Sequence, residues 1–163
     1  MIPGQAPGRD AHAGSGLDLR VPPAVVAAAG LTLQWWLTRG RRRVTPVGAL
    51  ASASLAAAGV RIGLGGIREF RRAETTIHPQ HPEETSALVG QGVYRFTRNP
   101  MYLAMGLGLL GVAALTGRAV ALLPVPGYVA WLDRFQIRPE ERALSARFGR
   151  AYDDYRSRVR RWL

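Results

Sequence analysis

Four stretches without a charged residue set the strongest limit on how this chain can fold. They cover residues 21–37, 44–60, 101–116 and 119–132, and the second continues past Arg61 to residue 67. If each stretch is a helix, its apolar residues go all the way round the helix, whereas a helix on the surface of a soluble protein shows one apolar stripe. Four such stretches in 163 residues leave little amphipathic surface to cover them. We therefore expect helices inside a lipid bilayer, although each run alone also suits a core helix of a soluble protein.

The last two stretches are the shortest. Only Gly117 and Arg118 separate them, and each falls below the roughly 20 apolar residues that a spanning helix needs. Pro124 and Pro126 should kink the second of them. We expect a tight hairpin that barely crosses the bilayer. The predicted fold is all-α, with about four transmembrane helices near residues 21–38, 44–67, 100–116 and 119–133.

The rest of the sequence completes one domain. Residues 1–20 are rich in Gly, Ala, Pro and Asp without a periodic apolar face, so we expect a disordered tail. Residues 21–163 form the membrane domain, with a polar loop at 68–99. Trp35 and Trp36 stand near the end of the first stretch and RGRRR follows, as at a bilayer boundary. A cleaved signal peptide is the alternative, but bulky residues follow the run where small ones are expected.

Arginine supplies all of the basic charge. The chain has 22 arginines, no lysine and a net charge of +11, so an anionic membrane surface or a nucleic acid is the expected partner. With an even number of spans, 16 arginines lie on the side of the termini and the 68–99 loop, and 5 lie opposite, Arg61 being inside a span. The larger group should face the cytoplasm, although RGRRR opposes the rule locally. We expect a multi-pass protein of the inner (cytoplasmic) membrane.

Metal and nucleic-acid binding find less support. The chain has no cysteine, which excludes thiolate metal sites. Its imidazoles are His12, His78 and His81, and the last two precede prolines, which favours extended loops over a metal site. Acidic residues interrupt the basic C-terminal segment and would repel phosphates. We therefore expect neither a metal nor a nucleic-acid partner, and an arginine-rich nucleic-acid-binding protein stays an alternative.

The sequence TRNPMY places charge at the start of the third stretch. Asn99 is a good helix N-cap, and Pro100 suits the first helical position. A helix N-terminus attracts anions, and the guanidinium of Arg98 is suited to bidentate binding of a carboxylate. This pattern indicates a carboxylate or phosphate receptor at the membrane edge. Contact of Arg95 and Arg98 with lipid headgroups is an equal alternative.

The C-terminal sequence EERALSARFGRAYDDYRSRVRRWL predicts an interfacial amphipathic helix over residues 139–160. Arginines fill its polar faces, which is typical of a helix in the headgroup plane. The apolar face recurs every three or four residues and comprises Leu144, Phe148, Tyr152, Tyr155 and Val159. Glu140 and Glu141 precede it. Paired carboxylates bind an ammonium or two ribose hydroxyls, or they simply suit a helix N-terminus.

Together, GVYRFTRNPMYL and EERALSARFGRAYDDYRSRV resemble motifs of the isoprenylcysteine carboxyl methyltransferase family. This family is similar to the phospholipid N-methyltransferases, and its members are membrane enzymes that use S-adenosylmethionine. The resemblance runs from about Phe70 to the C-terminus, and the combination of GxYRxxRNPxY with EExxLxxxFGxxYxxY is specific. It implies a membrane methyltransferase whose cofactor is S-adenosylmethionine. The arginine count, taken separately, predicts that the active site faces the cytoplasm.

The resemblance also implies which residues hold the cofactor. Asn99, Pro100 and Tyr102 should form part of the S-adenosylmethionine pocket. Glu140 and Glu141 should close it.

Further roles follow from the same resemblance. Arg98 should be the catalytic residue that faces the reacting group of the acceptor, with Tyr94 and Arg95 helping to bind the substrate. Gly63 and Gly65 match, loosely, a glycine pair that the lipid methyltransferases carry on the preceding helix, with Gly66, Gly106 and Gly108 as alternatives. Glycines in membrane helices more often serve packing.

Two departures from the family limit the substrate. Asn99 stands where the eukaryotic prenylcysteine enzymes have histidine, and Ala104 where they have glycine, so a prenylated protein substrate is not expected. The acceptor should be small or lipophilic and carry a carboxylate, thiol or amine. Nothing in the sequence resembles a dedicated base, which favours an anionic acceptor. A non-catalytic basic membrane protein that binds anionic lipid is a further alternative.

Overall fold

Every regular element in the residues that the structure describes is helical. The computed structural model describes residues 18–40, 42–73 and 88–163. In chain order these residues form α1 (Pro23–Thr38), α2 (Pro46–Arg72), the 3₁₀ helix η2 (Gly92–Arg95), α3 (Pro100–Thr116), the 3₁₀ helix η3 (Ala119–Leu122), α4 (Pro124–Leu132), the π-helical turn η4 (Asp133–Ile137), α5 (Arg138–Phe148) and α6 (Arg150–Arg158). The prediction of an all-α chain is confirmed for this part. Most of the tail expected at 1–20, the centre of the 68–99 loop and all three histidines lie outside the described residues.

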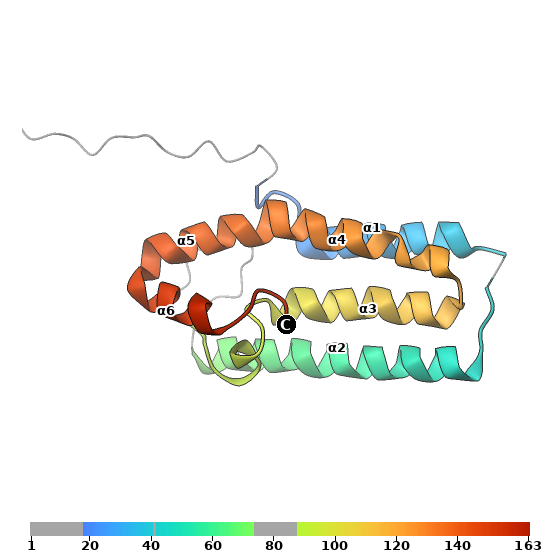
Figure 1. Cartoon of the computed structure of the whole chain (residues 1–163), viewed down its shortest axis with the longest axis horizontal. Helices are drawn as coiled ribbons and strands as arrows, with labels where there is room; N and C mark the ends of the chain where they lie inside the picture. The colour runs from blue at the N-terminus through green and yellow to red at the C-terminus, as the bar shows by residue number, and fades with distance from the viewer. Residues whose placement is uncertain (1–17, 41, 74–87) are drawn as a thin grey trace, which may run out of the picture.

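Helices α1 to α4 lie side by side along one axis, with α3 between α2 and the pair formed by α1 and α4 (Figure 1). Glycines allow α2 and α3 to approach closely. A Cβ on Gly59 would lie 3.0 Å from the carbonyl oxygen of Ala104, and one on Gly48 would lie 2.7 Å from that of Ala114. Small residues at such contacts are typical of helices that associate in membranes.

Prolines begin all four helices of this bundle. A proline in the first turn loses no hydrogen bond, because the first N–H groups of a helix have no partner inside it. The helices α1 to α4 begin at Pro23, Pro46, Pro100 and Pro124. Pro124 and Pro126 thus lie in the first turn of α4, and the helix expected over 119–133 is divided directly before Pro124 into η3 and α4.

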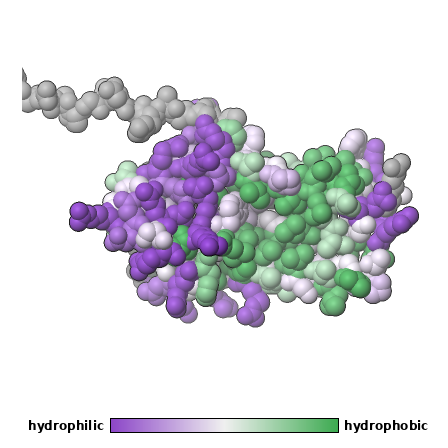
Figure 2. Space-filling model, in the orientation of Figure 1, coloured by the Kyte–Doolittle hydropathy of each residue, from purple (hydrophilic) through white to green (hydrophobic). Residues whose placement is uncertain are grey.

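Among the described residues, α2 is the one helix long and apolar enough to cross a bilayer. Only 6% of its most apolar 18-residue window is buried, whereas the core helix of a soluble protein would be mostly buried. α3 is apolar but has 17 residues, so length and composition identify one span where four were expected. Figure 2 shows a broad apolar band over the middle of the bundle and hydrophilic residues at its two ends.

α4, η4 and α5 form one continuous rod that extends past the end of the bundle (Figure 1). The π-helical turn lies where Pro139 enters the rod, since a proline has no N–H for the carbonyl four residues earlier, that of Phe135. Arg138 instead donates its N–H to the carbonyl of Asp133, five residues earlier. The carbonyl of Phe135 accepts a hydrogen bond from the N–H of Leu19, at 3.0 Å. The segment before α1 is thereby tied to this turn.

The single interfacial helix expected over 139–160 is two helices. Gly149, with φ of +51°, ends α5 and reverses the chain into α6. This reversal packs residues of the expected apolar face against one another, so that Tyr152, Tyr155 and Val159 are buried. The side chains packed around these three are Leu88, Leu144 and Phe148. The protein itself therefore covers this face, and the placement of α5 and α6 at the lipid headgroups stays a prediction.

Candidate functional site

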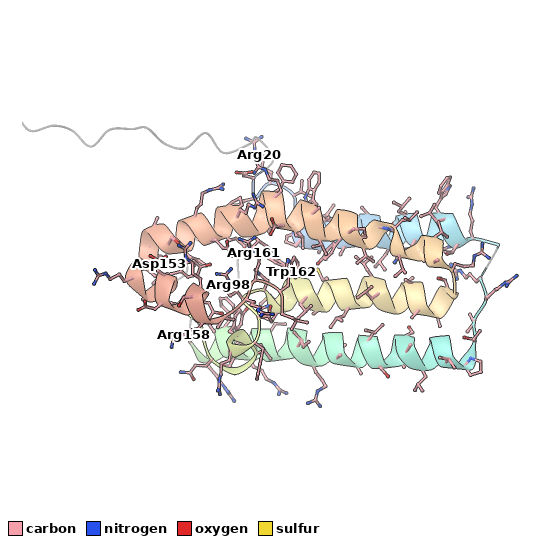
Figure 3. The ribbon with its side chains drawn as sticks, in the orientation of Figure 1. Arg20, Arg98, Asp153, Arg158, Arg161 and Trp162 are labelled. Atoms are coloured by element: carbon pink, nitrogen blue, oxygen red, sulfur yellow. The ribbon has the colours of Figure 1, made fainter. Side chains whose placement is uncertain are left out.

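The two sequence motifs meet where α3 begins. One motif leads into α3, and the other starts in α5, directly after the π-helical turn. The C-terminal tail, residues 159–163, returns to the same place, where Arg98, Arg161 and Trp162 lie close together (Figure 3). The site therefore lies at the arginine-rich end of the bundle.

Glu140 is the centre of a first group of contacts. The hydroxyl of Tyr102 donates a hydrogen bond to Oε1 of Glu140, and Nε2 of Gln136 donates to the same oxygen at 2.6 Å. Burial raises the pKa of Glu140 to about 7, against the lowering effect of these two hydrogen bonds, and the neighbouring Glu141 adds to the rise. Tyr102 is held in turn by Tyr128, whose hydroxyl donates to the Tyr102 carbonyl at 2.8 Å.

Glu141 is the centre of a second group. Nη2 of Arg98 lies 2.9 Å from its Oε1, and Arg161 binds both oxygens, with Nε at 3.1 Å and Nη2 at 2.6 Å. Nη1 of Arg161 also donates to Asp133 at 2.6 Å, and Asp133 accepts from Nε of Arg138 at 2.9 Å. Acidic and basic side chains therefore alternate in one connected network. We call this network the charged cluster; its members are Arg98, Glu141, Arg161, Asp133 and Arg138.

Asn99 precedes α3 as predicted, but its side chain does not cap the helix within the described structure. Nδ2 of Asn99 donates to the carbonyl of Arg161 at 2.9 Å, and the Thr97 hydroxyl donates to the same carbonyl at 3.3 Å. The N–H of Arg98 donates to the carbonyl of Arg160 at 3.0 Å. The tail is thus attached along the segment that leads into α3.

Tyr94 and Arg95 differ in their placement. Tyr94 is buried, its ring packs edge-on against Phe70 at 5.5 Å, and its carbonyl accepts a hydrogen bond from Tyr155 at 2.8 Å. Burial raises its pKa, with Tyr155 and Glu140 adding smaller contributions. Arg95 is exposed. The structure therefore places Tyr94 beside the site and leaves the side chain of Arg95 on the surface.

Gly63, Gly65 and Pro100 take part in packing. A Cβ on Gly65 would lie 2.7 Å from Cγ1 of Val93, and one on Gly63 would lie 3.4 Å from the Cβ of Ala104. Pro100 is buried against α2. Contact of these residues with a cofactor stays a prediction.

Sequence reasoning missed Gln136, Asp133 and Arg161. Gln136 stands one helical turn before Glu140, so the spacing alone could have suggested that the two side chains meet. Asp133 and Arg161 gave no comparable signal, because their ion pair joins residues 28 apart through the return of the tail. No group of three or more His, Cys, Asp or Glu side chains that could hold a metal occurs in the described part of the chain.

Comparison with known proteins gives a family match. A family model described as phospholipid methyltransferase matches residues 47–151, which run from α2 into α6. A relative from Haemophilus influenzae, described as an uncharacterized protein, is 40% identical over 63 residues, which is 39% of this chain and all of that protein. No solved structure matches.

Proposed function

This chain belongs to the phospholipid methyltransferase family, and we propose that it is an integral membrane enzyme that transfers a methyl group from S-adenosylmethionine to a small or lipophilic acceptor. The convergence of the two motifs carries this proposal. Tyr102 binds Glu140, and Arg98 binds Glu141, so residues some 40 positions apart form one partly buried site. A merely structural ion pair would not require a second carboxylate, Glu140, held beside it with a pKa raised to about 7.

We further propose that α1, α2, α3 and the η3–α4 segment all cross the inner membrane, with the site on the cytoplasmic side. Large apolar side chains on the outside of α1 and α2 support this topology. They include Val25, Leu31, Leu33, Trp35 and Trp36 on α1, and Val47, Leu50, Val60 and Leu64 on α2. Most arginines lie at the α5–α6 end, as expected for the cytoplasmic face.

The residues at the site offer partners for the charged groups of S-adenosylmethionine and of the acceptor. The Nε–H of Arg98 is buried and has no hydrogen-bond partner among the described residues, so this guanidinium keeps a donor for an anionic group. Glu140 offers a carboxylate for an ammonium or a hydroxyl. Asn99 and Glu141 already contact Arg161, so any contact that they make with a ligand is shared with the tail. Pro100 and Tyr102, at the start of α3, would form the adjoining wall.

When bound, S-adenosylmethionine supplies an electrophilic methyl group that a nucleophile takes by in-line displacement. The chain must then position the acceptor and exclude water. We assign Arg98 to hold the reacting group of the acceptor, with Tyr94 beside it. An anionic acceptor needs no base. A thiol or an amine must arrive or become unprotonated before it reacts.

Equilibrium binding tests this function. The purified, detergent-solubilised chain should bind S-adenosylmethionine, and membranes that contain the chain should incorporate labelled methyl from this donor into a product that control membranes lack. A chain that binds no S-adenosylmethionine would contradict the proposal. A chain that binds it without producing a labelled compound would be a non-catalytic relative.

A further inference from the structure

Arg161 joins the C-terminal tail to the charged cluster. One guanidinium contacts two carboxylates, those of Glu141 and Asp133, and the side chain stays 31% exposed. The hydrogen bond and the charge of Glu141 raise the pKa of Arg161, with a further contribution from Asp133. Arg161 lies outside the family match, which ends at residue 151.

The tail is held in place by contacts that do not use this guanidinium. The carbonyls of Arg160 and Arg161 accept hydrogen bonds from the N–H of Arg98 and from Nδ2 of Asn99. Trp162 packs against the apolar cluster that includes residues of α3 and α4. A substitution confined to the guanidinium of Arg161 should therefore leave the path of the tail unchanged.

The charge of the cluster depends on Arg161. Arg98 and Arg161 share Oε1 of Glu141, at 2.9 and 3.1 Å. Together with Asp133 and Arg138, these side chains carry one positive charge in excess. Without Arg161 the cluster is neutral, and Arg98 has the carboxylate of Glu141 to itself. A guanidinium paired in this way attracts a further anion less strongly.

We propose that Arg161 is a positioning residue that acts through Glu141 and keeps the guanidinium of Arg98 available for an anionic group of a ligand. The proposal rests on the proposed function, since a methyl donor or acceptor carries that group. The hydrogen-bond donor that remains for this anionic group is the unpartnered Nε–H of Arg98. The anion is either the carboxylate of S-adenosylmethionine or an anionic group of the acceptor, and the two sources can be separated.

Three variants test the role: Arg161→Gln, Arg161→Lys and, as a matched control, Arg160→Gln. Arg160 is an exposed neighbour in the same tail, and its substitution keeps the carbonyl that binds Arg98. Two probes are titrated onto each purified protein: S-adenosylhomocysteine, which has the carboxylate, and decarboxylated S-adenosylmethionine, which lacks it. Thermal melting of each variant establishes that it is folded.

If the anion is the carboxylate of the methyl donor, the two probes should respond differently to the variants. Arg161→Gln should bind S-adenosylhomocysteine about tenfold more weakly, since a charge-assisted contact is lost, and should bind the decarboxylated compound like the wild type. Arg161→Lys should recover part of the loss, and Arg160→Gln should show none. If the anion is on the acceptor, both probes should bind normally while labelled methyl transfer into membranes falls about tenfold in Arg161→Gln.

A folded Arg161→Gln that matches the wild type in both binding and transfer would overturn the role of Arg161 and leave the proposed function intact. Equal losses for both probes would also overturn it, because the effect would then be independent of an anion. A wild-type chain that binds neither S-adenosylmethionine nor S-adenosylhomocysteine would instead contradict the proposed function itself.

Discussion

Tyr102 and Glu140 lie 38 residues apart in the sequence and share a hydrogen bond in which the tyrosine hydroxyl donates to Oε1 of the carboxylate. This bond links the first turn of α3 to the first turn of α5. Gln136 donates to the same oxygen from the π-helical turn. Three elements, α3, the π-helical turn and α5, are therefore joined at one carboxylate oxygen. A change in any of them should alter the position or the pKa of Glu140.

Glu140→Gln should remove a pH dependence of stability. Burial raises the pKa of Glu140 from 4.5 to about 7, so between these values the folded chain binds a proton that the unfolded chain does not bind. The resulting stabilisation is full below pH 4.5 and is lost as the pH rises through about 7. The melting temperature of the wild type in detergent should therefore fall, relative to that of Glu140→Gln, across this range. Asp153→Asn, at an exposed acid, should follow the wild type, and parallel curves for Glu140→Gln would contradict the prediction.

Arg98→Ala should reduce methyl transfer roughly 100-fold or more while the chain stays in the membrane, because a group that stabilises the reacting charge is lost. Glu141 keeps its two contacts with Arg161, so the local fold should persist. Labelled transfer measures activity, and alkaline carbonate extraction measures insertion. Arg98→Lys keeps the charge without the planar fork and should recover only part of the activity. Retained turnover in Arg98→Ala would refute the assigned role.

Pro139→Ala should convert the π-helical turn toward a regular α-helix. The new N–H competes for the carbonyl of Phe135, which now accepts from Leu19. Hydrogen–deuterium exchange at Leu19 should become faster, and affinity for S-adenosylmethionine should fall severalfold as Glu140 shifts. Pro126→Ala, in the first turn of α4, frees no such contact and should change neither. An unchanged exchange rate at Leu19 in Pro139→Ala would show that the proline does not cause the turn.

Gly65→Ala should destabilise the chain by about 1–3 kcal/mol, because its Cβ would lie 2.7 Å from a methyl group of Val93. Adding Val93→Ala should recover much of the loss by removing that methyl group. Gly108→Ala is the matched control: no described atom lies within 4 Å of its added Cβ, so stability should stay the same or rise by up to about 1 kcal/mol. Thermal unfolding in detergent measures all three. If Gly65→Ala weakens S-adenosylmethionine binding at unchanged stability, the glycine contacts the cofactor instead.

The sequence predicted the helices, because apolar runs and a helix start such as that at Pro100 are local signals. That the two motifs meet was implied by the resemblance to a family and not by any local signal. It did not predict the arrangement of the C-terminus. The spacing of Tyr152, Tyr155 and Val159 correctly indicated an apolar face, but periodicity does not specify whether lipid or protein covers that face. Gly149 was the available signal for a chain reversal, since glycine readily adopts a positive φ.

The charged cluster was hidden for a different reason. Of the nine arginines after α4, the sequence gave no means to select Arg161 as the partner of Glu141. That choice depends on where the tail returns, which is set by tertiary contacts at Asn99 and Trp162. The π-helical turn was equally hidden, although Pro139 inside a helical pattern could have suggested an irregularity.

The unbroken passage from α4 into α5 has a consequence for the choice of acceptor. From Leu132 to Glu140 the rod rises by roughly 12 Å at the usual 1.5 Å per residue, with no loop to absorb a change in height. In the proposed topology, the carboxylates of Glu140 and Glu141 are therefore held at a fixed height above the hydrocarbon core of the bilayer. The enzyme would then select an acceptor first by how far its reactive atom protrudes from the lipid. The shape of the remaining atoms would matter only after that.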